Sequence, residues 1–548
     1  MEPSIKGENL AGWWIPDDTE PEQGDDAVRV AILKVIHPVF LLNLNGLAGV
    51  GRGGRITIGG HLPSESKVHP LTAYAPPLHP KDLGDPLFKA THKLRYAYIV
   101  GAMANGITSV DMVEDAGRAG MVGFFGSAGL TLNSIEAAID QLQKRLGRIP
   151  FGFNLIHSPH DPDLEFSTVQ LYLQKGIKLI SASAFLDLTL PLVYYRVKGI
   201  YRDNAGNIVC PNKVIAKVSR VEVAKKYLSP PPVKLLDQLV ARKLITQQEA
   251  SLASSIPVAE DITAEADSGG HTDNRPAIAL LPTMLALKDE LTKIYQYKKT
   301  PCVGLAGGIA TPESAAAAFA LGAAFILTGS INQSCVEAGT SEIVRIMLSE
   351  ASQADVTMAP AADMFELGVK VQVLKRGTMF PLRAAKLYDL YSSYDCLEDI
   401  PEQQKEILER DYFRCDFQEE WQQTKDYFCK MEPKQIERGE QNPKHKMALV
   451  FRSYLGQSSI WAISGDPSRK IDYQIWCGPA MGAFNQWVKG SFLEKPEYRK
   501  TVTVAMNLLY GAAVATRVNW LRFQGAVIPA DVGSFSPMTL PEILNLLE

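Results

Sequence analysis

Residues 301–329 read PCVGLAGGIATPESAAAAFALGAAFILTG. Two short apolar runs at 301–307 and 323–329 flank a helix-like segment that is rich in alanine. Thr311 can cap this helix, and Pro312 suits its first turn because a proline there loses no helical hydrogen bond. The stretch therefore predicts a strand, a helix and a second strand.

The same alternation extends upstream from this stretch, in the order expected for successive β/α units. Eight repeats over about 250 residues is the size of a (β/α)8 TIM barrel, which is the α/β fold that we predict. An open, doubly wound sheet is the structural alternative. The eight apolar runs are AYIVGAM (97–103), MVGFF (121–125), PFGFNLI (150–156), IKLISAS (177–183), KVIAKVS (213–219), DITAEAD (261–267), PCVGLAG (301–307) and AAFILTG (323–329).

The helix between the second and third runs has a clear apolar face. Its members recur at helical spacing, with Asn133 as the expected N-cap and Gly147 as the expected C-cap. The face consists of Ile135, Ala138, Ile139, Leu142 and Leu146.

The repeats divide the chain into three expected parts. Residues 1–90 are expected to form an N-terminal extension, residues 91–340 the barrel, and residues 341–548 a mainly helical C-terminal region in which strand-like runs stop. Two insertions interrupt the barrel repeats. Residues 194–212 have the turn chemistry of a hairpin, and residues 230–257 have a polar helical pattern.

Composition limits the classes of function. The chain has 548 residues, 46% of them apolar and 21% charged, and a net charge of −4, so it has the profile of a globular protein and no sign of a nucleic-acid partner. Its seven cysteines form no C-x-x-C pair, so we expect reduced thiols and no metal site. We expect no signal peptide, because the first residues contain no apolar run, and Gly322 divides the longest apolar stretch. We expect a cytoplasmic protein without a membrane span.

A G-x-G-x-x-G pattern occurs at Gly49, Gly51 and Gly54. A dinucleotide fingerprint needs a strand before it and a helix after it, whereas the pattern here is followed by the strand-like RITIGG. We interpret it as a glycine-rich turn.

The sixth run continues into DSGGHTDNRP, at the strand end where barrels carry their active sites. Gly269 and Gly270 allow the backbone to come close to a bound group. His271 follows them and exchanges protons near neutral pH, so it is the candidate catalytic residue.

The loops after the seventh and eighth strands are the usual phosphate site of a barrel. Both are glycine-rich here, and a helix N-terminus after each would favour an anion. Their candidate residues are Gly307, Gly308, Gly329 and Ser330.

Three other strand ends carry groups suited to a heterocyclic ligand. Met103, Ala104 and Asn105 follow the first strand, and Asn154 ends the third, where an amide can bond ring nitrogens and carbonyls. Lys217 lies on the fifth strand. It would either point inwards and neutralise charge on a ring or lie at the solvated end of the strand.

These motifs resemble a known group of proteins. GAMANG, FGFNL, EADSGGHT, GLAGGI and ILTGSINQ occur at the expected strand ends and resemble the flavin barrels that include nitronate monooxygenases and flavin-dependent enoyl-ACP reductases. EADSGGHTDNRP, with DYQIWCGPAMGAFNQW (472–487) and RSYLGQSSIWA (452–462), is closer to the PfaD-type enoyl reductases of polyunsaturated fatty acid and polyketide synthases.

The resemblance implies an FMN-binding barrel that takes electrons from NADPH and reduces enoyl thioesters on an acyl carrier protein. The glycines, amides and lysine above would line the FMN, and His271 would protonate the substrate or hold its thioester carbonyl. A homodimer is implied by the resemblance alone. Two rival hypotheses are a nitronate monooxygenase and a non-catalytic docking subunit of a synthase.

Overall fold

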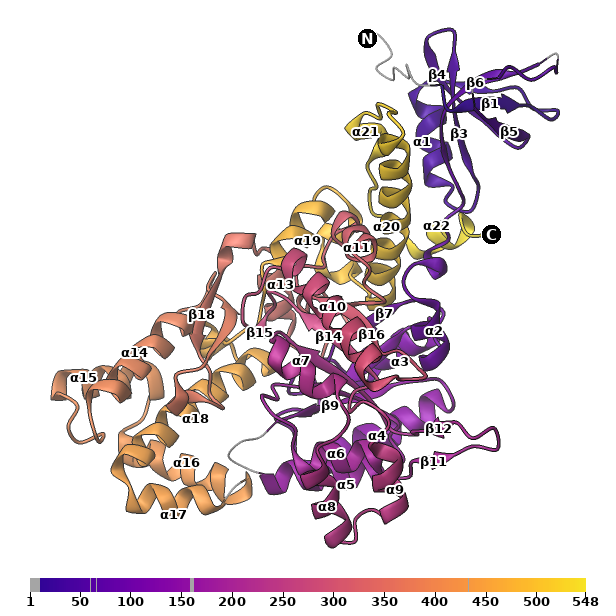
Figure 1. Cartoon of the computed structure of the whole chain (residues 1–548). Coiled ribbons are helices and arrows are strands. Elements are labelled where there is room, and N and C mark those ends of the chain that lie inside the picture. The colour runs from indigo at the N-terminus through magenta and orange to yellow at the C-terminus, as the bar shows by residue number, and fades with distance from the viewer. Residues whose placement is uncertain (1–9, 60, 66, 158–161, 432) are drawn as a thin grey trace.

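The centre of the molecule is a closed barrel of eight parallel strands (Figure 1). A computed structural model describes residues 10–59, 61–65, 67–157, 162–431 and 433–548. Each apolar run forms one strand, so the predicted TIM barrel is confirmed and the open sheet is excluded. The strands are β7 (Tyr98–Val100), β8 (Val122–Phe125), β9 (Gly152–Ile156), β10 (Leu179–Ser183), β13 (Lys213–Val218), β14 (Asp261–Glu265), β16 (Cys302–Ala306) and β17 (Ile326–Thr328).

Helices follow the strands and cover the outside of the barrel. The predicted apolar face of α4 is buried, and Gly147 caps its C-terminus. The expected N-cap was wrong: the Thr131 hydroxyl accepts from the Ser134 N–H, and Asn133 lies inside the first turn. Thr311 caps α11 as predicted. The helices are α3 (Val110–Arg118), α4 (Leu132–Leu146), α5 (Pro162–Gln174), α6 (Leu190–Val197), α7 (Val221–Leu228), α10 (Ala277–Tyr295), α11 (Pro312–Ala320) and α12 (Ser330–Gln333).

The N-terminal end of the barrel is plugged. Helix α2 (Pro86–His92) lies across it and buries Phe88, whose ring stacks on Phe325 with centroids 4.1 Å apart. His92 Nε2 lies 2.6 Å from Asp261 Oδ2 inside this plug. A ligand can therefore approach the interior only from the opposite end, where the strands finish.

Both predicted insertions are confirmed. Strands β11 (Tyr201–Arg202) and β12 (Ile208–Val209) form the hairpin, and the Gly206 N–H donates to the Asp203 carbonyl in its turn. Helices α8 (Val233–Ala241) and α9 (Gln247–Ala253) form the second insertion.

The N-terminal segment forms a compact antiparallel sheet. Helix α1 (Asp25–Leu33) packs on one face of the sheet and buries Val28 and Ile32. Gly53 and Gly54 have positive φ between β4 and β5, which confirms the predicted turn. The strand order is β2-β4-β3-β6-β1-β5, with bounds β1 (Gly12–Ile15), β2 (Glu22–Gln23), β3 (Val39–Leu44), β4 (Leu47–Gly51), β5 (Arg55–Ile58) and β6 (His69–Ala75).

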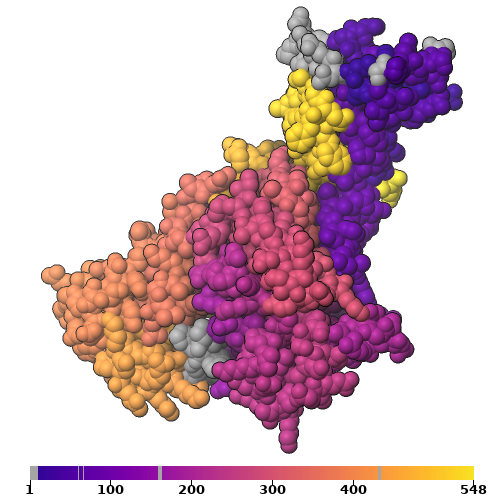
Figure 2. All heavy atoms as spheres, viewed as in Figure 1, coloured from indigo at the N-terminus to yellow at the C-terminus, as the bar shows by residue number. Residues whose placement is uncertain are grey.

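The C-terminal region is mainly helical, as predicted, and projects beside the barrel mouth (Figures 1 and 2). The expectation that strands stop before it was wrong. Strands β18 (Val356–Pro360) and β19 (Lys370–Leu374) form a separate sheet with β15 (Gly270–His271). Strand β15 lies in the loop that follows the barrel strand β14. The division at residues 90 and 340 stays a prediction. The α-helices of this region are α13 (Glu342–Ser349), α14 (Phe380–Ser393), α15 (Glu402–Ile407), α16 (Phe417–Met431), α17 (Pro433–Gln441), α18 (Pro443–Ser464), α19 (Ala480–Val488), α20 (Thr501–Phe523), α21 (Ala530–Gly533) and α22 (Leu540–Asn545).

Helix α20 joins the N-terminal sheet to the barrel, since it packs on α11, α1 and β6 (Figure 1). In the described part of the chain it alone is long and apolar enough to cross a membrane, and 83% of its apolar window is buried. Arg517 is buried on this helix and donates to the carbonyls of Ile32 and His37. Burial lowers the pKa of Arg517 to about 10.

We predict that Arg517→Ala loosens the N-terminal sheet. The change leaves the carbonyls of Ile32 and His37 without their donor, which costs about 1–3 kcal/mol for a buried group. Urea unfolding and limited proteolysis of the N-terminal segment measure the effect. Arg29→Ala, on the exposed side of α1, is the control. Equal stability of the two variants would contradict this role of Arg517.

Candidate functional site

Lys217 lies inside the barrel mouth. The side chain of Ile215 packs with Phe325 in the apolar cluster inside the barrel. Side chains two residues apart on a strand point to the same face, so Lys217 also points into the barrel. Lys217 Nζ is 2.7 Å from Glu265 Oε1, and the two side chains are 17% and 16% exposed. The alternative of a solvated strand end is therefore excluded, and Glu265 is a neighbour that sequence reasoning did not assign to the site.

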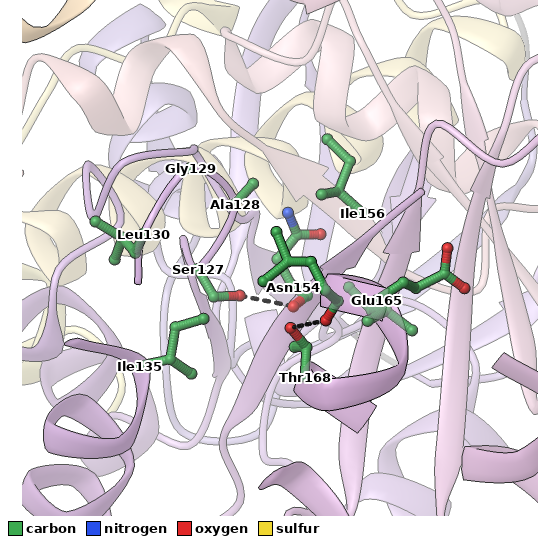
Figure 3. A pocket seen from close by; sticks show the side chains of 11 residues that line it. Ser127, Ala128, Gly129, Leu130, Ile135, Asn154, Ile156, Glu165 and Thr168 are labelled. Atoms are coloured by element: carbon green, nitrogen blue, oxygen red, sulfur yellow. Dashed lines mark hydrogen bonds between the residues drawn. The ribbon is translucent and has the colours of Figure 1, made fainter. Parts of the chain in front are cut away.

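Asn154 is buried in the middle of β9, two residues before the strand ends. Its side-chain oxygen accepts from the Ser183 hydroxyl at 3.2 Å, and its backbone carbonyl accepts from the hydroxyls of Ser127 and Tyr172. Figure 3 shows the side-chain amide pointing away from Ser127. These bonds hold the amide in one orientation at the mouth.

A small polar cavity lies beside Asn154 (Figure 3). Its volume is about 60 Å3, and Gly129, Glu165 and Thr168 contribute to its lining. Ligand pockets usually measure about 300–1,000 Å3, so this cavity suits water and not a flavin.

The loop after β7 is pressed against the loop after β8. The Met103 N–H donates to the Thr108 hydroxyl at 2.9 Å, and Asn105 has a positive φ of 56°. A Cβ on Gly126 would lie 1.6 Å from the Met103 carbonyl oxygen, so only glycine fits there. Asn105 Nδ2 also lies 3.4 Å from Ser459 Oγ on α18.

The two predicted phosphate loops present free backbone donors. Within the described residues, no acceptor is found for the N–H groups of Gly307, Gly308, Gly329 and Ser330. A Cβ built on Gly308 or Gly329 would meet no atom within 4 Å, so both loops face open space. Gly307 and Gly308 have φ of 85° and 74°, which glycine adopts without strain. These loops fit an anionic group such as a phosphate.

His271 lies on β15, which pairs with β19 of the C-terminal region. His271 is opposite Val371, and Gly270 is opposite Gln372. His271 Nε2 is 3.2 Å from Asp363 Oδ1. Burial opposes protonation of the ring, but the hydrogen bond and charge of Asp363 outweigh it and raise the pKa of His271.

The loop around His271 is held on both sides. Gln372 Nε2 donates to Asp267 Oδ1 and to the Ser268 carbonyl, both at 2.8 Å. On the other side, Asp273 accepts from Arg220 at 2.9 Å. The Arg220 hydrogen bonds lower the pKa of Asp273 to about 2, against a smaller effect of burial.

The short segment directly before α19, residues 475–478, crosses the site. A Cβ on Gly269 would lie 2.9 Å from the Cys477 backbone nitrogen, so the two backbones touch. The Gly478 N–H donates to the Ser330 hydroxyl at 3.1 Å. This segment therefore ties the sixth-strand loop to the eighth-strand loop.

Every predicted site residue except Asn154, which lies in the middle of β9, lies near the C-terminal end of a barrel strand or in the loop that follows it. Their roles stay predictions. The residues that sequence reasoning missed are Glu265, Asp363, Gln372 and Gly478. Glu265 and Gly478 had a signal, since they lie in EADSGGHTDNRP and in the segment 472–487, which both carry the resemblance. Asp363 lies 92 positions from its partner and had none.

Models of known protein families match this chain in two places. Residues 86–390 match the nitronate monooxygenase model. Residues 394–473 match the inserted helical domain of [acyl-carrier-protein] S-malonyltransferase. The first match includes the whole barrel, and the second covers helices α15 to α18.

Among curated proteins, the chain is 48% identical to the polyketide biosynthesis protein PksE of Bacillus subtilis over 435 residues. That match covers 79% of this chain and 56% of PksE. The chain is also 46% identical over 448 residues to one of the polyunsaturated fatty acid synthase proteins of Thraustochytrium, and this match covers 80% of this chain and 30% of that protein. The chain thus spans roughly a third to just over half of these relatives.

A solved structure resembles most of the chain. It is the crystal structure of the enoyl reductase domain of MlnA from the macrolactin biosynthesis cluster of Bacillus amyloliquefaciens. The TM-score is 0.76 at 40% identity, and the match covers 81% of this chain and 99% of that one.

We predict that Gly269→Ala lowers the free energy of unfolding by about 1–3 kcal/mol, because the new methyl group overpacks against the Cys477 backbone. Gly329→Ala is the control for stability: its φ is −131° and its Cβ direction is open. Urea unfolding followed by tryptophan fluorescence compares them. If both variants unfold like the parent protein, the 475–478 segment does not press on this loop.

Proposed function

Since the chain belongs to the nitronate monooxygenase family, we propose that it is an FMN-dependent oxidoreductase that uses NADPH to reduce the carbon–carbon double bond of enoyl thioesters on an acyl carrier protein. The observation that carries this proposal is the likeness over 81% of the chain to an enoyl reductase domain. The relatives from polyketide and polyunsaturated fatty acid synthases support a place in such biosynthesis.

The residues present fit FMN. The free N–H groups of Gly307, Gly308, Gly329 and Ser330 would hold its phosphate, since backbone donors and open space meet there. Bound there, FMN would supply hydride transfer between NADPH and the substrate. The ring would lie among the other predicted site residues, which are Met103, Ala104, Asn105, Asn154, Lys217, Gly269 and Gly270.

Lys217 and His271 have different roles in this proposal: Lys217 stabilises negative charge on the flavin ring, and His271 acts on the substrate. Lys217 lies inside the mouth, where a cation stabilises negative charge on a ring, and Glu265 orients it. His271 lies on the rim, with a raised pKa that keeps its ring protonated further into the neutral range. A protonated imidazole can give a proton to the α-carbon or hold the thioester carbonyl.

The carrier-protein partner is proposed from the relatives' names. Those names describe synthase components and polyketide biosynthesis proteins, in which acyl chains are carried as thioesters. Homodimerisation and a cytoplasmic location stay predictions.

Nitronate oxidation is the second candidate function, favoured by the description of the family model. The loop after His271 argues against it. Asp273 accepts hydrogen bonds from Arg220 and Ser219, which fixes the loop after His271, and we expect this loop to reshape the substrate side of the site. A docking protein without activity is the third hypothesis, and the same experiment distinguishes all three.

We predict that the protein purifies yellow with FMN bound. Without oxygen, NADPH should bleach its absorbance, and an enoyl pantetheine thioester should restore it, because the substrate is the electron acceptor. The absorbance spectrum measures both steps. A saturated acyl thioester is the control and should leave the flavin reduced.

Other results of the same experiment would support the nitronate oxidase or the docking protein. Reoxidation by oxygen alone, together with oxygen consumption when a nitronate is added, supports the oxidase. A colourless protein that neither binds FMN nor oxidises NADPH supports the docking role.

We predict that His271→Ala keeps FMN and its reduction by NADPH but slows reoxidation by the enoyl thioester. A positioned general acid contributes about 10²–10⁴-fold, so the rate should fall by that factor. Stopped-flow absorbance separates the two half-reactions. His61→Ala, which removes an exposed histidine of the N-terminal sheet region, is the control.

His271→Gln distinguishes the two roles of His271. Glutamine can still donate a hydrogen bond to a carbonyl but cannot transfer a proton at neutral pH. Recovery of most of the rate would assign the carbonyl-holding role, and a rate as low as that of the alanine variant would assign proton transfer. Wild-type rates in both variants would exclude His271 from the chemistry.

A further inference from the structure

We propose that Asp363, supplied by the C-terminal region, is a positioning residue that orients His271 so that its Nδ1 delivers the proton to substrate. This inference rests on the proposed function and adds to it the residue that orients His271, the proposed proton donor. The observation behind it is the hydrogen bond between His271 Nε2 and Asp363 Oδ1 across two parts of the chain.

The backbone places the two side chains opposite each other. Asp363 follows β18, and β19 then returns to pair with β15, so that Val371 lies opposite His271. The Ala361 N–H donates to the Val369 carbonyl and closes the loop between these strands. The carboxylate is thus presented by a short loop within one sheet.

The loop that bears Asp363 is anchored to α18. Arg452 Nε donates to the Ala362 carbonyl at 2.9 Å, and its guanidinium lies 3.7 Å from Glu366. Glu366 in turn accepts from His445 Nδ1 at 2.9 Å. Helix α18, which lies in the part of the chain that matches the malonyltransferase insert, therefore anchors the loop that presents Asp363 to His271.

The charges around His271 favour its protonated form. Asp363 and Glu265 are the acidic groups that face it, and Lys217 is the opposing cation. Arg452 stabilises the charged form of Asp363, whose pKa is lowered mainly by His271 against the effect of burial. The net result is a raised pKa for His271 beside a carboxylate that stays ionised.

The hydrogen bond also selects the reactive nitrogen. An ionised carboxylate only accepts, so Nε2 must carry a proton, both in the imidazolium and in the neutral ring. Nδ1 has no partner among the described residues. In the reaction, hydride reaches the β-carbon and the Nδ1 proton reaches the α-carbon, so the π bond is replaced by two C–H bonds. His271 is left neutral, with Nε2–H still on Asp363.

The exposure of the pair suits repeated turnover. The side chain of His271 is 33% exposed and that of Asp363 is 47% exposed. Solvent can therefore return a proton to Nδ1 after each cycle without movement of the loop.

Asp363→Asn tests the proposal in the full-length flavoprotein. Asparagine can still accept from Nε2 but carries no charge, so the orientation is kept and the pKa of His271 should fall. The rate of flavin reoxidation by an enoyl pantetheine thioester should then decline from a lower pH than in the wild type. At a pH above the His271 pKa of both proteins, the rate in Asp363→Asn should be about tenfold lower than in the wild type for each unit by which the His271 pKa falls.

Asp363→Ala removes the acceptor as well as the charge. We expect its reoxidation rate to be low even at acidic pH, where His271 is protonated but no longer oriented. FMN content and reduction by NADPH should not change in either variant. Asp395→Asn is the matched control, because Asp395 is a fully exposed carboxylate of the same region.

A second measurement does not depend on turnover. Nuclear magnetic resonance of 13C-labelled histidine, with His271→Ala to assign the signal, gives the pKa of His271 directly. It should be higher in the wild type and in Asp395→Asn than in Asp363→Asn.

The outcomes separate this inference from the proposed function. If the wild type fails to reduce the enoyl thioester, the proposed function fails, whatever the titration shows. If the wild type reduces it but Asp363→Ala is reoxidised as fast as the wild type at acidic pH, the positioning role of Asp363 is overturned. An unchanged pH profile and an unchanged His271 pKa in Asp363→Asn overturn its effect on the charge of His271.

Discussion

The parallel pairing of β17 with β7 is the contact on which the rest of the structure depends. Ile326 pairs with Tyr98 and Thr328 with Val100, and the Tyr98 hydroxyl lies 2.6 Å from the Thr328 hydroxyl in the buried seam. These strands begin and end the repeat, so their pairing converts a sheet into a barrel. Once the barrel is closed, all eight C-terminal strand ends surround one mouth, and loops far apart in sequence become neighbours.

The C-terminal region packs against the loops that surround this mouth. Strand β19 pairs with the strand that carries His271, and the Gly478 N–H donates to the Ser330 hydroxyl in the loop after β17, two strands further round the barrel. The region therefore does more than cover the barrel. It provides the strand partner, the carboxylate and the close backbone contact that hold the sixth-strand loop in place.

Buried arginines show how the outer parts are fixed to the barrel. Arg499 donates to Ser334 beside the eighth-strand loop and to Asn485 on α19, and burial lowers its pKa to about 10. Arg517 does the same between α20 and the N-terminal segment. Arg499 replaces the lost hydration of its charge with carbonyl, hydroxyl and amide acceptors, and Arg517 does so with two backbone carbonyls, so each joint depends on more than one partner.

The sequence by itself determined the barrel and the location of its mouth. Apolar runs of strand length, helices with one apolar face and glycines after the seventh and eighth strands are local patterns, and the structure confirms the strands that they predict. Only the tertiary structure decided the inward direction of Lys217, its pairing with Glu265 and the contact of His271 with Asp363. Those contacts join residues far apart in the chain, and no local periodicity encodes which distant loop will reach a strand end. Strands β18 and β19 were missed although they pair mainly with each other. What the local pattern of β19 does not show is its short pairing with β15, which joins this hairpin to the loop that carries His271.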